Sequence, residues 1–236
     1  MHPLVYFIDE SIKRRGSTEI CALVAIKTID PKQLRELIDD SVNKVIADPI
    51  LSQHNGIDHK WAPHYCNDHP FEVHSFFLRE IAQLPFEAYI AFGTKERLIG
   101  VNEYDWYDHL ARVIFSFRFS ADKDRSVSIV FEQHDSKVTT RQENLRYLFQ
   151  KLATKTAQRR KNIARLPSVT SAGKEELILC IPDYIAGCFM AYLCNENKNM
   201  IAADRRKYEI VSKKLRWIKD LDSKTIYTSK NPFFRD

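Results

Sequence analysis

The chain has 236 residues, of which 44% are hydrophobic, so it can bury a full core as one domain or as one domain with appendages. Six glycines and nine prolines, without an internal repeat or a low-complexity tract, exclude a disordered or fibrous protein. We expect no signal peptide and no membrane span, because no basic segment followed by an apolar run opens the chain and we expect no apolar run of the roughly 18 residues that a span needs. The five cysteines fit reduced thiols in a cytoplasmic protein.

The net charge of +5 hides an asymmetry along the chain. Residues 1–136 contain 15 Lys and Arg against 21 Asp and Glu, whereas residues 137–236 contain 21 against 10. The split predicts a cationic face on the C-terminal part, and a phosphate backbone is the commonest partner of such a face. An ordinary set of solvated helix faces would give the same counts.

The first predicted element is a buried strand over residues 5–11 that ends in two adjacent acids, Asp9 and Glu10. Side chains alternate along a strand, so Asp9 and Ser11 share one face and Glu10 takes the other. Carboxylates at the rim of a sheet need a cation or a helix N-terminus nearby, unless they begin a solvated turn. A polar turn over residues 12–18 then leads to a second strand, which makes a hairpin.

The remaining elements alternate between helices and strands. Asp30 and Pro31 predict a helix start, as N-cap and first helical residue. The apolar spacing and the flanking prolines and glycines predict six helices and, with the second strand included, four strands after the first. The tail from residue 225 is predicted to be irregular. The predicted helices cover about 31–46, 70–81, 104–119, 140–160, 177–194 and 201–218, and the strands 19–29, 86–92, 127–131 and 166–171.

Residues 50–70 form a His-rich irregular stretch. Five histidines recur there and just beyond at intervals of five residues: His54, His59, His64, His69 and His74. A zinc site built on His59, His64, Cys66 and His69 is one hypothesis, because imidazole and thiolate are zinc ligands. The spacing matches neither a strand face nor a helical i, i+4 pair, so a loop whose histidines bond locally is the alternative.

Three segments each present acids from hydrophobic surroundings: Asp9 with Glu10, Glu132 with Asp135, and Asp183. Two strand-end acids and a helical acid can converge at one rim of a mixed sheet. Converging carboxylates repel one another unless a cation sits between them, and Mg²⁺ and Mn²⁺ prefer oxygen ligands. Two such ions can activate water and steady the leaving oxygen of a phosphodiester. The sequence therefore indicates a divalent-metal site.

Four segments in this order resemble the domain of unknown function 3800 family, whose fold is ribonuclease H-like. They are Phe-Ile-Asp-Glu-Ser at 7–11, the His64 segment at 63–68 with the helix and strand behind it, the fourth strand ending at Glu132, and Ile-Pro-Asp-Tyr-Ile-Ala-Gly at 181–187. The resemblance covers roughly residues 4–195. Two positions depart from the family pattern, because Ile12 replaces a Gly and Glu132 replaces an Asp. The longer Glu side chain can shift a metal by about an ångström and slow chemistry.

The resemblance implies an α/β, ribonuclease H-like domain over residues 1–195, with a mixed five-stranded sheet flanked by helices. Residues 196–236 would form a C-terminal helix and tail packed on it. Members of the family often lie near mobile elements and phage-defence genes, which suggests a nuclease role, and the acids of the motifs imply that it depends on a divalent metal. The implied site consists of Asp9, Glu132 and Asp183 as ligands of Mg²⁺ or Mn²⁺, with Glu10 and His64 as accessory groups.

A basic run at the end of the fourth predicted helix and just beyond it would hold the backbone of DNA or RNA without sequence preference. It consists of Lys155, Arg159, Arg160, Lys161 and Arg165. The alternative is a non-catalytic nucleic-acid-binding or assembly subunit on the same fold, favoured by Glu132 in place of Asp. A nucleophilic hydrolase is disfavoured, because no Gly-x-Ser-x-Gly elbow appears. The choice of DNA or RNA, a protein partner and the oligomeric state stay open.

Overall fold

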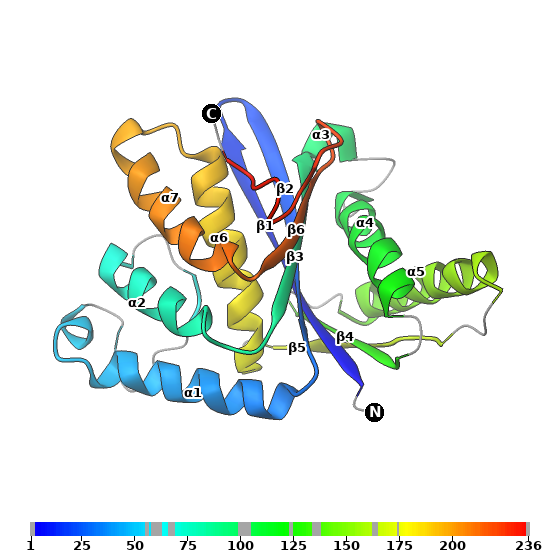
Figure 1. Ribbon diagram of the computed structural model, residues 1–236, viewed down its shortest axis with the longest axis horizontal. Coiled ribbons are helices and arrows are strands. Elements are labelled where there is room, and N and C mark those ends of the chain that lie inside the picture. The colour runs from blue at the N-terminus through cyan, green and yellow to red at the C-terminus, as the bar shows by residue number, and fades with distance from the viewer. Residues whose placement is uncertain are drawn as a thin grey trace.

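Seven strands form one mixed sheet in the order β5-β4-β1-β2-β3-β6-β7 (Figure 1). The computed structural model describes residues 3–54, 57, 63–65, 69–98, 105–122, 125–133, 138–161, 165–173 and 175–234. The first three strands form an antiparallel meander, and β4 and β5 continue it in parallel beyond β1. The strands are β1 (Leu4–Arg15), β2 (Thr18–Thr28), β3 (Glu87–Thr94), β4 (Val127–Glu132), β5 (Ser168–Ala172), β6 (Leu215–Asp220) and β7 (Ile226–Tyr227).

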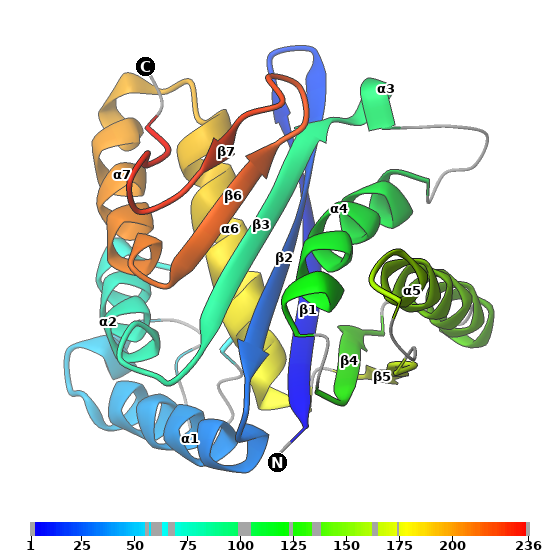
Figure 2. The same ribbon diagram turned by 45° about the vertical axis from the view of Figure 1, so that its right-hand side comes forward.

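The sheet has two more strands than the five predicted. The segment that supplies β6 was predicted to be the end of the last helix, because Leu215 and Ile218 continue its apolar spacing. Instead the helix stops at Ser212 and β6 pairs in parallel with β3, while β7 pairs with β6 (Figure 2). The open edge of β3 decides this outcome, because its backbone groups need hydrogen-bond partners that the local pattern cannot show.

The first strand is also longer than predicted. It continues through the expected polar turn to Arg15, which pairs with Thr18, the first residue of β2. Only Gly16 and Ser17 form the turn, and Gly16 has a φ of +58°, which a residue without a side chain adopts easily. Asp9 therefore lies in the middle of β1 rather than at its end.

Seven helices lie among the described residues, and they cover both faces of the sheet. They are α1 (Pro31–Ala47), α2 (Phe71–Ile81), α3 (Lys95–Leu98), α4 (Asp105–Ala121), α5 (Val138–Arg159), α6 (Cys180–Cys194) and α7 (Lys198–Ser212). The predicted N-cap of α1 is confirmed, because Asp30 accepts a hydrogen bond of 2.9 Å from the backbone of Gln33. One face of the sheet, here called the α6 face, is covered by α1, α2, α6 and α7; the other, the α5 face, is covered by α4 and α5 (Figures 1 and 2).

Each strand divides its side chains between the two faces. On β1, Val5 and Phe7 belong to the core of the α6 face, whereas Tyr6 and Ile8 belong to the core of the α5 face. This alternation places Asp9 on the α6 face, beneath α6, which packs directly on β1.

The core helix α6 corrects the prediction about apolar runs. Residues Leu177–Cys194 form an 18-residue segment with a mean hydropathy of 1.8, which is long and apolar enough to cross a membrane. In the structure 89% of this segment is buried inside the protein. Its hydrophobicity is explained by packing, because β1 and β2 cover one side of α6 and α7 covers another.

Candidate active site

Two of the predicted acids lie next to each other in the sheet. The parallel ladder between β1 and β4 pairs Ile8 with Phe131, and the next residues on the two strands are Asp9 and Glu132. Val130, two residues before Glu132, packs against the core of the α6 face, so both acids point to that face. Asp9 is 3% exposed and Glu132 is 6% exposed. Two adjacent carboxylates withdrawn from water need compensation, which makes them unlike ordinary surface acids.

The third acid, Asp183, lies in the first turn of α6 on the same face of the sheet. Its Oδ2 accepts a hydrogen bond of 2.8 Å from the backbone N–H of Tyr65, and His64 Nδ1 lies 3.6 Å from the same oxygen. The Asp183 and His64 side chains are each 26% exposed. Asp183 is thus held by a segment more than a hundred residues earlier in the chain.

His64 has one nitrogen near Asp183 and a second one that is buried. Its Nε2 is buried, and within the part of the chain that the structure describes it has no hydrogen-bond partner. An imidazole oriented by a carboxylate through one nitrogen can exchange a proton through the other. The position of His64, with Nδ1 beside the Asp183 carboxylate, makes it the candidate for proton transfer at this site.

A close backbone approach fixes this pairing. Gly187 follows Asp183 by one helical turn, and a Cβ added at Gly187 would lie 2.3 Å from two ring atoms of Tyr65. The Tyr65 ring also lies against the rings of His74 and Tyr184, at centroid distances of 4.7 and 5.7 Å. The absence of a side chain at Gly187 lets the Tyr65 segment sit on α6 and deliver its N–H to Asp183. Two of the segments that carry the family resemblance therefore contact each other.

The donor atoms of this site fit a hard divalent cation, because all three acids offer carboxylate oxygens. Asp183 retains Oδ1 when its Oδ2 is engaged by Tyr65. Among the described residues, however, no group of three or more Asp, Glu, His and Cys side chains is close enough to form a complete ligand set. Metal binding by Asp9, Glu132 and Asp183 remains a prediction.

The other predicted site residues are placed as follows. Glu10 lies on β1 with its side chain alternating to the α5 face, away from Asp9. Asp135 lies outside the described residues, as do His59 and Cys66 of the zinc hypothesis. Of the two remaining zinc candidates, His64 faces Asp183, whereas the ring of His69 lies beside His74, with 5.8 Å between centroids.

The predicted basic run lies on the other side of the sheet from the acids. Lys155 and Arg159 are exposed in the last turns of α5, which covers the α5 face (Figure 1). Arg160 donates a hydrogen bond of 2.5 Å to the backbone oxygen of Ser120 at the end of α4, and Lys161 and Arg165 are exposed beyond α5. The expectation that this run holds a strand lying across the three acids is therefore not supported by its position.

A cavity on the α6 face, here called the Tyr65 cavity, was missed by sequence reasoning. It has a volume of about 480 Å³, and Lys13, Tyr65, Cys194 and Lys207 are among the residues that line it. The predicted turn concealed Lys13, because only a strand that continues past Ser11 puts Lys13 on the same face as Asp9. Strand alternation extended by two residues would have been the signal.

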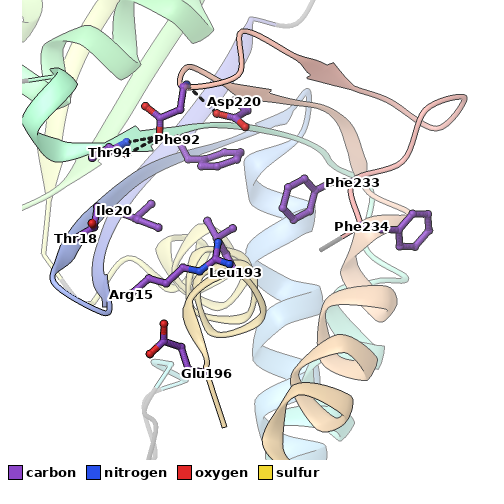
Figure 3. A pocket seen from close by; sticks show the side chains of 11 residues that line it. Arg15, Thr18, Ile20, Phe92, Thr94, Leu193, Glu196, Asp220, Phe233 and Phe234 are labelled. Atoms are coloured by element: carbon purple, nitrogen blue, oxygen red, sulfur yellow. Dashed lines mark hydrogen bonds between the residues drawn. The ribbon is translucent and has the colours of Figure 1, made fainter. Parts of the chain in front are cut away.

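A second cavity, of about 610 Å³, lies near the hairpin end of the sheet and the C-terminal tail (Figure 3). Phe92, Leu193 and Phe233 give it apolar walls. Three carboxylates line it, Glu196, Asp220 and Asp222, and two of them are engaged in local structure. Asp222 Oδ2 accepts bonds from the N–H and the hydroxyl of Thr94, and Asp220 Oδ1 accepts from the Asp222 backbone. We therefore place the candidate site at Asp9, Glu132 and Asp183.

Comparison of the chain with models of known protein families found no match, and a search of the curated proteins found none either.

Proposed function

We propose that the protein is a divalent-metal-dependent nuclease that hydrolyses phosphodiester bonds, with Asp9, Glu132 and Asp183 at its active site. The observation that carries the proposal is the position of Asp9 and Glu132, buried side by side on parallel strands, on the face that α6 covers. Unrelated parts of the chain supply these acids, and buried acids of this kind are typical of functional sites.

The strand order supports the proposal. The first five strands of the sheet have the order β3-β2-β1-β4-β5, with an antiparallel meander followed by two parallel strands. This order is compatible with the ribonuclease H-like fold that the family resemblance implies. We infer a ribonuclease H-like domain extended by β6 and β7, and a fold alone leaves the reaction open.

In this proposal Asp9, Glu132 and Asp183 would hold Mg²⁺ or Mn²⁺ through carboxylate oxygens, and the ion would supply Lewis-acid activation of water and of the leaving oxygen. The residues of the chain do the rest. Burial of Asp9 and Glu132 excludes bulk water from the reacting centre. Asp183 Oδ2 lies 3.6 Å from Nδ1 of His64, and Nε2, which has no hydrogen-bond partner among the described residues, would accept or donate the proton. DNA and RNA are both substrates that this chemistry admits.

The test is strand cleavage by the purified chain, measured on supercoiled plasmid and on labelled single-stranded DNA and RNA, with Mg²⁺, Mn²⁺ or EDTA. We expect cleavage only with a divalent ion. Asp9→Asn should lower the rate by on the order of a hundredfold or more, because it removes a charge at the centre of the site. Asp39→Asn, an exposed acid on α1, is the matched control and should cleave normally. Metal-independent cleavage, or full activity of Asp9→Asn, would overturn the proposal.

The second candidate is a non-catalytic nucleic-acid-binding or assembly subunit. It is favoured by Glu132 where the resembled family has Asp, and by the engagement of one Asp183 oxygen with the Tyr65 amide. In that case Asp9→Asn leaves nucleic-acid or protein binding intact, and the wild-type chain does not cut any of the substrates above.

A further inference from the structure

Lys13 connects the Tyr65 cavity to the candidate site along a single strand. Asp9, Ser11 and Lys13 alternate onto the α6 face, so Lys13 follows Asp9 at a distance of about 13 Å along β1. The side chain of Lys13 lines the cavity together with residues of α6 and α7. The same strand therefore presents an acid at the reacting centre and a cation a short distance beyond it.

Lys207, on α7, brings a second cation to the cavity although it is only 8% exposed. Its Nζ lies 2.7 Å from Oδ1 of Asp204, which is 2% exposed, and Asn195 donates a bond of 2.8 Å to Oδ2 of the same carboxylate. Both oxygens of Asp204 thus have partners, and the network holds the Lys207 ammonium in one place. A fixed ammonium binds an anion with less loss of side-chain entropy than a mobile surface lysine.

Tyr65 brings the two lysines together. The Nζ atoms of Lys13 and Lys207 lie 5.6 and 5.9 Å from the centroid of the Tyr65 ring. The backbone N–H of Tyr65 donates to Asp183, so one residue borders both the cavity and the candidate site. A ligand in the cavity would contact a ring, two ammonium groups and the region next to the acids.

The charge of the cavity suits an anion. Burial lowers the pKa of Lys13, although the nearby charge of Asp204 opposes this effect. A desolvated ammonium gains more from a bound anion than a hydrated one does. Lys13, Arg14 and Lys207 line the cavity together with two carboxylates, Asp204 and Glu196, so its lining has an excess of one positive charge. Asp204 is bound by Lys207 and Asn195, and Arg14 lies 3.5 Å from Glu19 outside the cavity.

We propose that the Tyr65 cavity binds a phosphate group of a nucleic-acid strand, through Lys13 and Lys207, with the Tyr65 ring against the adjoining sugar or base. The proposal rests on the nuclease function above, because it names the path of the strand as it leaves Asp9 and Glu132 along β1. It also replaces the basic run on α5 as the strand-holding surface. Aromatic rings beside backbone-binding cations are the usual elements of single-strand recognition.

The test measures binding without cleavage. A fluorescein-labelled, 5′-phosphorylated single-stranded oligonucleotide is titrated with the chain in EDTA, at several salt concentrations, by fluorescence anisotropy. Lys13→Met should weaken binding on the order of tenfold and lower the slope of log K against log salt by about 0.7, as expected for one lost phosphate contact on a single strand. Lys13→Arg should restore most of the affinity, because it returns the charge.

Lys155→Met on α5 is the matched control, since it removes one positive charge from the other face of the sheet. It should leave both the affinity and the salt slope unchanged. Thermal melting of each variant verifies that it is folded. Lys207→Met leaves Asp204 buried without its cation, so Lys13 carries the test and Lys207 is examined only as Lys207→Arg.

A competition arm separates the two sources of phosphate. If only unlabelled oligonucleotide displaces the labelled one, the cavity binds the phosphate of a strand. If a nucleoside monophosphate displaces it equally well, the phosphate site is supported and is assigned to free nucleotide. Unchanged affinity and slope for Lys13→Met, or an equal loss for Lys155→Met, would overturn the proposal. Because binding is measured in EDTA, a chain that binds through Lys13 yet never cleaves would refute the nuclease function and leave the phosphate site standing.

Discussion

Gly187→Ala is the sharpest test of how the candidate site is built. The added methyl group would lie 2.3 Å from Cγ and Cδ1 of Tyr65, whereas ordinary contact begins at about 3.4 Å, so the ring must retreat by roughly 1 Å. The rings of His74 and Tyr184 lie behind it. The backbone of Tyr65 must therefore move too, which lengthens its 2.8 Å hydrogen bond to Asp183.

The expected change in the free energy of unfolding combines three effects, one stabilising and two destabilising. Alanine stabilises a helix interior by about 1 kcal/mol relative to glycine. Overpacking costs about 1–3 kcal/mol, and loss of a hydrogen bond to a carboxylate costs about 1.5–3 kcal/mol. We expect a net loss of about 2–3 kcal/mol, which in a domain of this size lowers the melting temperature by roughly 5–10 °C. The cleavage rate should fall by more than the loss of folded protein accounts for, because Asp183 and His64 lose their alignment.

The assay is urea denaturation together with metal-dependent cleavage, and Tyr65→Ala supplies the control. Removing the ring makes room for the methyl group, so Gly187→Ala should cost little stability in a Tyr65→Ala background. This pairwise coupling distinguishes a steric clash with Tyr65 from a general effect on α6. A Gly187→Ala variant that melts at or above the wild-type temperature with unchanged cleavage would refute the reasoning.

Two further predictions concern the charged network on the α5 face. Burial raises the pKa of Glu87, but hydrogen bonds from Lys27 and Tyr89 outweigh this effect and lower the pKa to about 2, against an ordinary value of 4.5. Glu87 therefore contributes about 2–3 kcal/mol of stability that is present above about pH 4.5 and is lost as the pH falls toward 2. Denaturation at a series of pH values should show this loss in the wild type and not in Glu87→Gln. Arg118 lies 3.1 Å from the carboxylate of Asp122, whose side chain is 9% exposed. Arg118→Met should therefore lower the free energy of unfolding, measured by urea denaturation, by about 3–5 kcal/mol. A loss below about 1 kcal/mol would contradict the pairing.

The chemistry-bearing residues of the α6 face were accessible to sequence reasoning only in part. Asp9 and Glu132 each follow an apolar strand segment, and Asp183 stands in a largely apolar helix, so each was found from its local pattern. That Asp9 and Glu132 point to the same face of the sheet follows only from the parallel pairing of β1 with β4. This pairing joins segments far apart in the sequence, so it could not be predicted from local patterns. The error about the basic run on α5 has the same origin, because charge counts do not say which face of the sheet a helix covers.

The sequence by itself determined the alternation of helices and strands, the N-cap at Asp30 and the three acids, since these depend on residues adjacent along the chain. Only the tertiary structure decided the rest. The open edge of β3 converted residues 215–220 from helix to strand, and β2 extended β1 through Lys13. Because Gly187 has no side chain, the ring of Tyr65 packs on α6 and its backbone N–H reaches Asp183. These outcomes depend on backbone hydrogen bonds and close contacts between segments far apart in sequence, which no local pattern contains.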